Sequence, residues 1–72
     1  MLQKKLGQRI ASLRKGRKLT QEQLAEAVGC SVEFVSLIER GVNAPSVSGL
    51  EKFAKILKVK VRELFTFEDK KR

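Results

Sequence analysis

The sequence predicts an all-α protein made of five short helices. Three observations support this prediction. Apolar residues recur at intervals of three and four, no segment alternates as a half-buried strand does, and glycine, proline, serine and threonine separate the periodic stretches. A chain of 72 residues has room for one compact domain. We expect that domain to span residues 1–67, followed by a charged tail over residues 68–72.

The first two helices have well-marked ends. The first is predicted from about Leu2 to Lys15, because the segment that begins at Gly16 breaks the periodicity. The second begins after Thr20, since Thr20 and Gln23 have the T-x-x-Q spacing of a capping box. Gly29 ends it, because glycine takes a positive φ without strain. The side chains expected on the inner faces of these two helices are Leu2, Leu6, Ile10, Leu13, Leu24, Ala25 and Val28.

The other three helices are shorter, and serine residues mark where two of them begin. Ser31 is placed to cap the third helix, over about residues 31–40, and Gly41 closes it. Ser46 caps the fourth helix, and a fifth is expected from about Val61 to Phe65. The inner faces of these helices are predicted to present Val35, Ile38, Leu50, Phe53, Ala54, Leu57, Leu64 and Phe65.

The composition favours a polyanionic partner and excludes several kinds of chemistry. Sixteen lysines and arginines against eight acidic residues give a net charge of +8, which favours nucleic acid first and an anionic membrane surface second. With no histidine and one cysteine, Cys30, the chain cannot build a Ser-His-Asp triad, a Cys-His pair or a zinc site of the usual kind. The N-terminus has no long apolar stretch. We therefore expect a cytoplasmic, non-enzymatic protein without metal, cofactor or membrane segment.

The stretch from Gln21 to Arg40 is the most informative part of the chain. It predicts two short helices joined by a turn that begins at Gly29, and small Ala25 lets the two helices approach closely. Such an arrangement holds the second of the two helices out from the body of the domain. A helix presented in this way fits the DNA major groove, which is about 12 Å wide.

Five segments at fixed spacings form one pattern along the chain: LGQRI, LTQEQLAEAVGCS, IERGVNAPS, KFAKILKV and RELF. This pattern resembles the phage lambda repressor and Cro type of helix-turn-helix domain, also called the XRE type. The resemblance implies a compact five-helix lambda-repressor-like fold and a transcriptional regulator that binds double-stranded DNA at a palindromic operator as a two-fold homodimer. In this family glycine usually stands where this chain has Lys18 and Lys58, so each lysine would cost roughly 1 kcal/mol if its backbone is left-handed.

The outward face of the third helix is predicted to read DNA bases. With Val35 and Ile38 directed inward, the helical period turns Glu33, Ser36 and Leu37 outward and leaves Val32 on the flank. Glu33 can accept a hydrogen bond from cytosine N4, a serine can bond to a base or a phosphate, and Val32 and Leu37 can cover thymine methyl groups. The family more often has Arg, Lys or Gln at positions 32 and 37, so this face is unusually apolar.

Phosphate contacts are predicted on either side of that face. Gln21 is the first residue of the second helix, whose N–H groups and dipole favour an anion, and the matching glutamine of similar repressors contacts the DNA backbone. Ser31 at the cap of the third helix, and Arg40 and Asn43 at its end, match further contact positions of the family.

An ion pair, a dimer contact and an alternative function are also predicted. Arg14 and Glu39 each follow an inward apolar residue by four positions, and similar repressors have an ion pair at the matching sites. The apolar residues left for a dimer contact are Leu64, Phe65 and Phe67. Alternatively, an exposed apolar patch could make the chain an antitoxin-like protein-interaction module with secondary DNA binding, and that patch would comprise Val32, Phe34 and Leu37.

Overall fold

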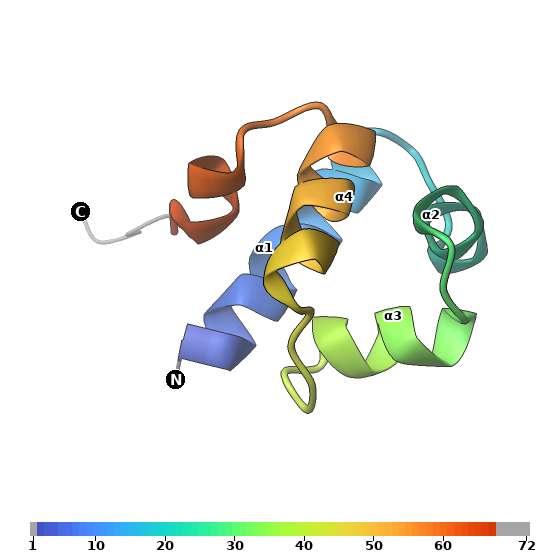
Figure 1. Cartoon of the computed structure of the whole chain (residues 1–72), viewed down its shortest axis with the longest axis horizontal. Helices are drawn as coiled ribbons and strands as arrows, with labels where there is room; N and C mark the ends of the chain where they lie inside the picture. The colour runs from blue at the N-terminus through green and yellow to red at the C-terminus, as the bar shows by residue number, and fades with distance from the viewer. Residues whose placement is uncertain (1, 68–72) are drawn as a thin grey trace.

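The computed structural model describes residues 2–67, which form four α-helices and one 3₁₀ helix (Figure 1). The predicted all-helical class is confirmed, and the described residues contain no strand. The fifth predicted helix is a single 3₁₀ segment, so the count of five α-helices is not confirmed. The predicted tail, residues 68–72, lies outside the described residues. The elements are α1 (Leu2–Gly16), α2 (Gln21–Val28), α3 (Val32–Glu39), α4 (Val47–Leu57) and η1 (Val61–Phe65).

Local hydrogen bonds start the helices at the predicted residues. Thr20 Oγ1 accepts from the backbone N–H of Gln23 at 3.0 Å, and Gln23 Oε1 accepts from the N–H of Thr20 at 2.8 Å, which completes the capping box of α2. Ser31 Oγ caps α3 and Ser46 Oγ caps α4, each by accepting a backbone N–H at 3.1 Å. These bonds fix where α2, α3 and α4 begin.

Left-handed backbone ends or follows several of the helices. Gly29 has a φ of 92° at the end of α2, as the sequence predicts. Lys18 and Lys58, with φ of 59° and 61°, take the same conformation without glycine's freedom. Because a side chain in this region crowds the following carbonyl, each lysine costs roughly 1–2 kcal/mol of stability.

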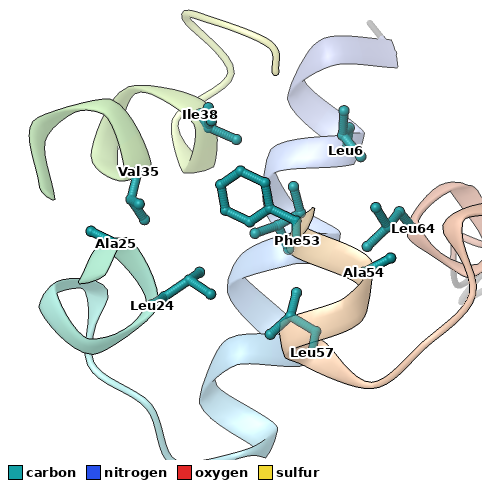
Figure 2. Packing of buried hydrophobic residues seen from close by; sticks show 10 residues of the cluster. Leu6, Leu24, Ala25, Val35, Ile38, Phe53, Ala54, Leu57 and Leu64 are labelled. Atoms are coloured by element: carbon teal, nitrogen blue, oxygen red, sulfur yellow. The ribbon is translucent and has the colours of Figure 1, made fainter. Parts of the chain in front are cut away.

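Side chains from all five elements meet in one core. Figure 2 shows them converging around the ring of Phe53, which α4 supplies. Fully burying a large apolar side chain stabilises a domain by about 1.5–3 kcal/mol, so these few residues account for much of the stability of so short a chain. The buried apolar residues are Leu6, Ile10, Leu24, Ala25, Val35, Ile38, Phe53, Ala54, Leu57 and Leu64.

The packing leaves α3 along one edge of the molecule, while η1 lies on the side away from α2 (Figure 1). Helix α3 packs on both α1 and α2, and η1 packs on α1 and α4. Within residues 2–67, none of the helices combines the length and the apolar character needed to cross a membrane.

Candidate nucleic-acid interface

Helices α2 and α3 form the compact unit that the sequence predicts. The chain turns between them over residues 29–31, where the backbone N–H groups of Gly29 and Cys30 both donate to the carbonyl of Ala25, at 2.8 and 2.9 Å. Ala25 is buried, so the two helices approach closely at this small residue. The turn is therefore short and held by hydrogen bonds, and it fixes the direction of α3 relative to α2.

The rotation of α3 about its axis agrees with the predicted one. Val35 and Ile38 are buried, whereas Glu33 is exposed, Val32 is 37% exposed, and Ser36 and Leu37 are half-buried. The four residues predicted to read bases thus lie outside the core on the solvent side of the helix. Polar Glu33 and Ser36 and aliphatic Val32 and Leu37 present both kinds of group that base edges in the major groove can contact.

Phe34 is shared between the core and the surface of α3. Its side chain is half-buried and packs against the buried core residues. The aliphatic side chains among the four residues predicted to read bases are therefore Val32 and Leu37.

A buried ion pair ties α3 to α1. Arg14 Nε donates to Glu39 Oε2 at 2.7 Å and Nη2 donates to Oε1 at 3.1 Å, a bidentate arrangement between side chains only 10% and 7% exposed. The third nitrogen of the guanidinium, Nη1, donates to the carbonyl of Leu19 at 2.7 Å. The predicted pair is present, and its extra bond also holds the loop that leads into α2.

Gln21 joins the same network, which the sequence analysis did not foresee. Its Nε2 donates to Glu39 Oε1 at 2.9 Å, so the amide is held at the N-terminus of α2 by the last residue of α3. An amide nitrogen carries two hydrogens, and the second is free to donate to another acceptor. The bond thus holds the side-chain amide of Gln21 at the N-terminus of α2. Eighteen residues separate Gln21 from Glu39, and no local pattern in the sequence marks such a bond.

The other predicted phosphate contacts lie at the two ends of α3 and are all exposed. Ser31 Oγ accepts the capping bond and still has its hydroxyl hydrogen to donate. Arg40 ends the helix, and Asn43 follows in a loop whose backbone N–H groups bond to the carbonyl of Leu37, at 2.9 Å from Val42 and 3.3 Å from Asn43. This loop is therefore fastened to α3.

Charge is unevenly distributed around this surface. Residues 20–46 contain four glutamates and one arginine, a net charge of −3, although the whole chain carries +8. The excess of positive charge lies outside the helix-turn-helix. One of these charges, on Lys4, is close to the end of α3, because Gly41 packs against Lys4. A Cβ on Gly41 would lie 2.8 Å from the Cα of Lys4. Exposed Lys4, on α1, is thereby fixed beside the end of α3, a long-range contact that sequence reasoning missed.

The predicted dimer contact is wrong for one of its three residues, Leu64. Leu64 has no exposed surface, because η1 turns it inward to close the core against α1 and α4. Phe65 and Phe67 are half-buried, with their rings edge to face at 6.5 Å between centroids. Lys5 Nζ lies 5.9 Å from the centre of the Phe67 ring. The aromatic surface is therefore made by Phe65 and Phe67 alone.

Cys30, in the turn between α2 and α3, behaves as a small apolar residue. It is half-buried and packs against the core. Burial raises the pKa of its thiol above the ordinary value, because the thiolate would lose solvation. The thiol therefore stays protonated near neutral pH, and nothing in its surroundings lowers its pKa as a redox switch would need.

Comparison with known proteins identifies the class. The sequence profile of the helix-turn-helix family HTH_3 matches residues 10–64, and the chain belongs to this family. The family and the relatives of this chain are DNA-binding transcriptional regulators, not enzymes. The chain is 48% identical over 56 residues to the immunity repressor protein of Bacillus phage phi105. That match covers 78% of this chain but 39% of the phage repressor.

Two solved structures share both fold and sequence with the chain. The restriction-modification controller protein C.AhdI from Aeromonas hydrophila is 39% identical, with a TM-score of 0.83 over 86% of this chain and 94% of that one. SinR, a master regulator for biofilm formation solved in complex with DNA, is 37% identical, with a TM-score of 0.79 over 85% of this chain and 98% of that one. Both superpose over nearly the whole helical domain.

Proposed function

We propose that this protein is a sequence-specific regulator of transcription that inserts α3 into the major groove of an operator. The observation that carries the proposal is the way α3 is packed against the domain and exposed on its outer face. Its core-facing residues are buried, its Glu39 is locked to Arg14, and its polar and aliphatic face is open to solvent. A helix that is packed on one side and presents polar and aliphatic groups on the other is what direct readout of base edges requires. The names of a phage repressor and of a SinR–DNA complex among its relatives support the same function.

The charges on and around α3 have different effects on the affinity for DNA and on the selectivity for its sequence. Glu33 is repelled by phosphates, so it gains on binding only where a cytosine N4 group donates to it. Attraction to the duplex must come from residues around α3, where the oriented Gln21, the capping Ser31, Arg40, Asn43 and Lys4 are available for phosphates. The acidic helix-turn-helix thus selects a sequence, and the basic remainder of the chain supplies non-specific attraction.

We further propose that two copies bind a palindromic operator as a two-fold dimer. Phe65 and Phe67 supply the apolar contact, since they form an edge-to-face pair on the η1 side of the domain, remote from α3 (Figure 1). A palindromic operator requires the two α3 helices of the dimer to lie about 34 Å apart, one turn along the duplex. Phe67→Asp is expected to reduce self-association in sedimentation equilibrium, while Val47→Asp on exposed α4 leaves it unchanged. If both variants self-associate equally, the proposed aromatic contact is refuted.

Selection from random duplexes tests the proposed function. The chain is expected to recover a palindromic site, with a binding constant that falls with salt at a log–log slope of about 0.9 per neutralised phosphate. Gln21→Ala should weaken binding to all sequences alike, whereas Glu33→Ala should relax preference at one base pair of each half-site. Exposed Glu51 on α4 gives the matched control, because Glu51→Ala removes the same charge away from α3. Failure to enrich any sequence, or a salt-independent affinity, would refute the proposal.

A further inference from the structure

Helices α1 and α3 touch backbone to backbone at Gly7. This residue is buried in the middle of α1, where the helix meets the last turn of α3. A Cβ placed on Gly7 would overlap the carbonyl oxygen of Ile38 and lie 2.9 Å from that of Glu39. Real Cβ atoms do not approach other atoms so closely. The two helices can therefore be this close only because position 7 has no side chain.

The atoms met at Gly7 cannot move aside independently. Both are main-chain oxygens of α3, so any displacement moves the helix as a body, whereas a crowded side chain could rotate. The Arg14–Glu39 ion pair, by contrast, joins α3 to α1 through side chains. Long side chains adapt to shifts of several tenths of an ångström, but two backbones in contact do not.

We propose that Gly7 is a positioning residue, which sets how far α3 stands out from the domain and thereby how well its outer face meets DNA bases. The inference rests on the proposed function and concerns the specificity of that same surface. Any side chain at position 7 would push the C-terminal half of α3 away from α1 by roughly 1 Å, the shift that restores ordinary contact between carbon and oxygen. Ser36 and Leu37, two of the residues predicted to read bases, lie in that half.

Specific and non-specific binding respond differently to such a shift. Hydrogen bonds to base edges weaken steeply with distance and angle, so a displaced helix loses selectivity. Attraction to phosphates acts over a screening length of about 8 Å and barely changes with a shift of 1 Å. The ratio of the two affinities therefore isolates positioning. A loss of folded protein, by contrast, lowers both affinities equally and leaves their ratio unchanged.

Gly7→Ala, compared with Gly16→Ala, tests the inference. Gly16 lies on the same helix, and a Cβ there would meet nothing within 4 Å. The affinity of each variant is measured for the duplex selected by the wild-type chain and for a scrambled duplex at one salt concentration. For Gly7→Ala the ratio is expected to fall at least about tenfold, equivalent to about 1.4 kcal/mol, with non-specific affinity within about twofold of wild type. Gly16→Ala is expected to keep both affinities.

The possible outcomes separate this inference from the proposed function. A folded Gly7→Ala variant that keeps the wild-type ratio overturns the role of Gly7 and leaves the proposed function standing. If the wild-type chain shows no sequence preference, the proposed function is refuted, and the role of Gly7 is refuted with it. Should the variant not fold, it is remeasured with Lys58→Gly, which relieves a left-handed lysine on another helix end. If that chain is also unfolded, Gly7 is required for folding and the positioning role is rejected.

Discussion

Replacing Arg14 with methionine is expected to destabilise the domain severely. The guanidinium makes three hydrogen bonds, two to the carboxylate of Glu39 and one to the carbonyl of Leu19. Its removal leaves the carboxylate, only 7% exposed, with Gln21 as its remaining donor in the network. Breaking a buried pair by removing one partner costs about 3–5 kcal/mol. A domain of this length has a total stability of about 4–11 kcal/mol, so the variant should be marginally folded.

A double-mutant cycle separates the ion pair from loss of packing. Chemical unfolding followed by circular dichroism is measured for the wild type, Arg14→Met, Glu39→Met and the double variant. Because the double variant buries no unpaired charge, we expect it to be more stable than the sum of the single changes predicts, by at least about 2 kcal/mol. Exposed Lys15 gives the control, and Lys15→Met should change stability by less than about 0.5 kcal/mol. A cost below about 1 kcal/mol for Arg14→Met, typical of exposed pairs, would refute the reasoning.

Three smaller effects are expected. Lys58→Gly should stabilise the domain by about 0.5–1 kcal/mol, since it relieves left-handed strain at the cost of added chain entropy. Thermal unfolding measures it, with Lys55→Gly inside α4 as a destabilising control. Thr20→Ala should cost about 1 kcal/mol by removing the α2 cap, measured in the same way. Cys30 should react with iodoacetamide at pH 8 more slowly than free cysteine does, because burial raises the pKa of its thiol and so lowers the thiolate fraction.

The raised pKa of Cys30 also gives a dependence of stability on pH. The folded chain holds the thiol proton more tightly than the unfolded chain, so this contribution is complete below the ordinary pKa of 9.0 and is lost as the pH rises further. Cys30→Ala should remove that part of the alkaline loss. Alkylation as fast as that of free cysteine would contradict the burial of the thiol. A stability unchanged by Lys58→Gly would show that the lysine is not strained, and an equally stable Thr20→Ala would show that the cap is dispensable.

Helix ends and most inward faces could be predicted because their causes are local, although Leu2, which the sequence places on the inner face of α1, is 60% exposed. A cap and its acceptor lie three residues apart, as Thr20 and Gln23 do, and a glycine with positive φ, such as Gly29, acts where it stands. The inward and outward sides of α3 follow from the helical period once Val35 and Ile38 are recognised as core residues. Those features also place the candidate DNA surface, so its residues follow from the sequence.

Contacts between distant parts of the chain could not be predicted in this way. The bond from Gln21 to Glu39 and the backbone contact at Gly7 depend on how α1, α2 and α3 pack in three dimensions. The sequence predicts a dimer contact for Leu64 because so short a chain has few other apolar residues to offer, but the packing of η1 buries this side chain completely. The sequence predicts a short helix over the same segment, and with only five residues this helix has the tighter 3₁₀ form.

The central claim is that the exposed face of α3 meets the DNA, and amide chemical shifts on addition of the selected duplex test it directly. We expect the largest changes at the N-terminus of α2, over residues 31–37 and in the loop after α3. Small changes are expected over α4, whose Lys52 and Lys55 lie exposed beside α2. Changes centred on α4 or η1, with α3 unaffected, would contradict the account.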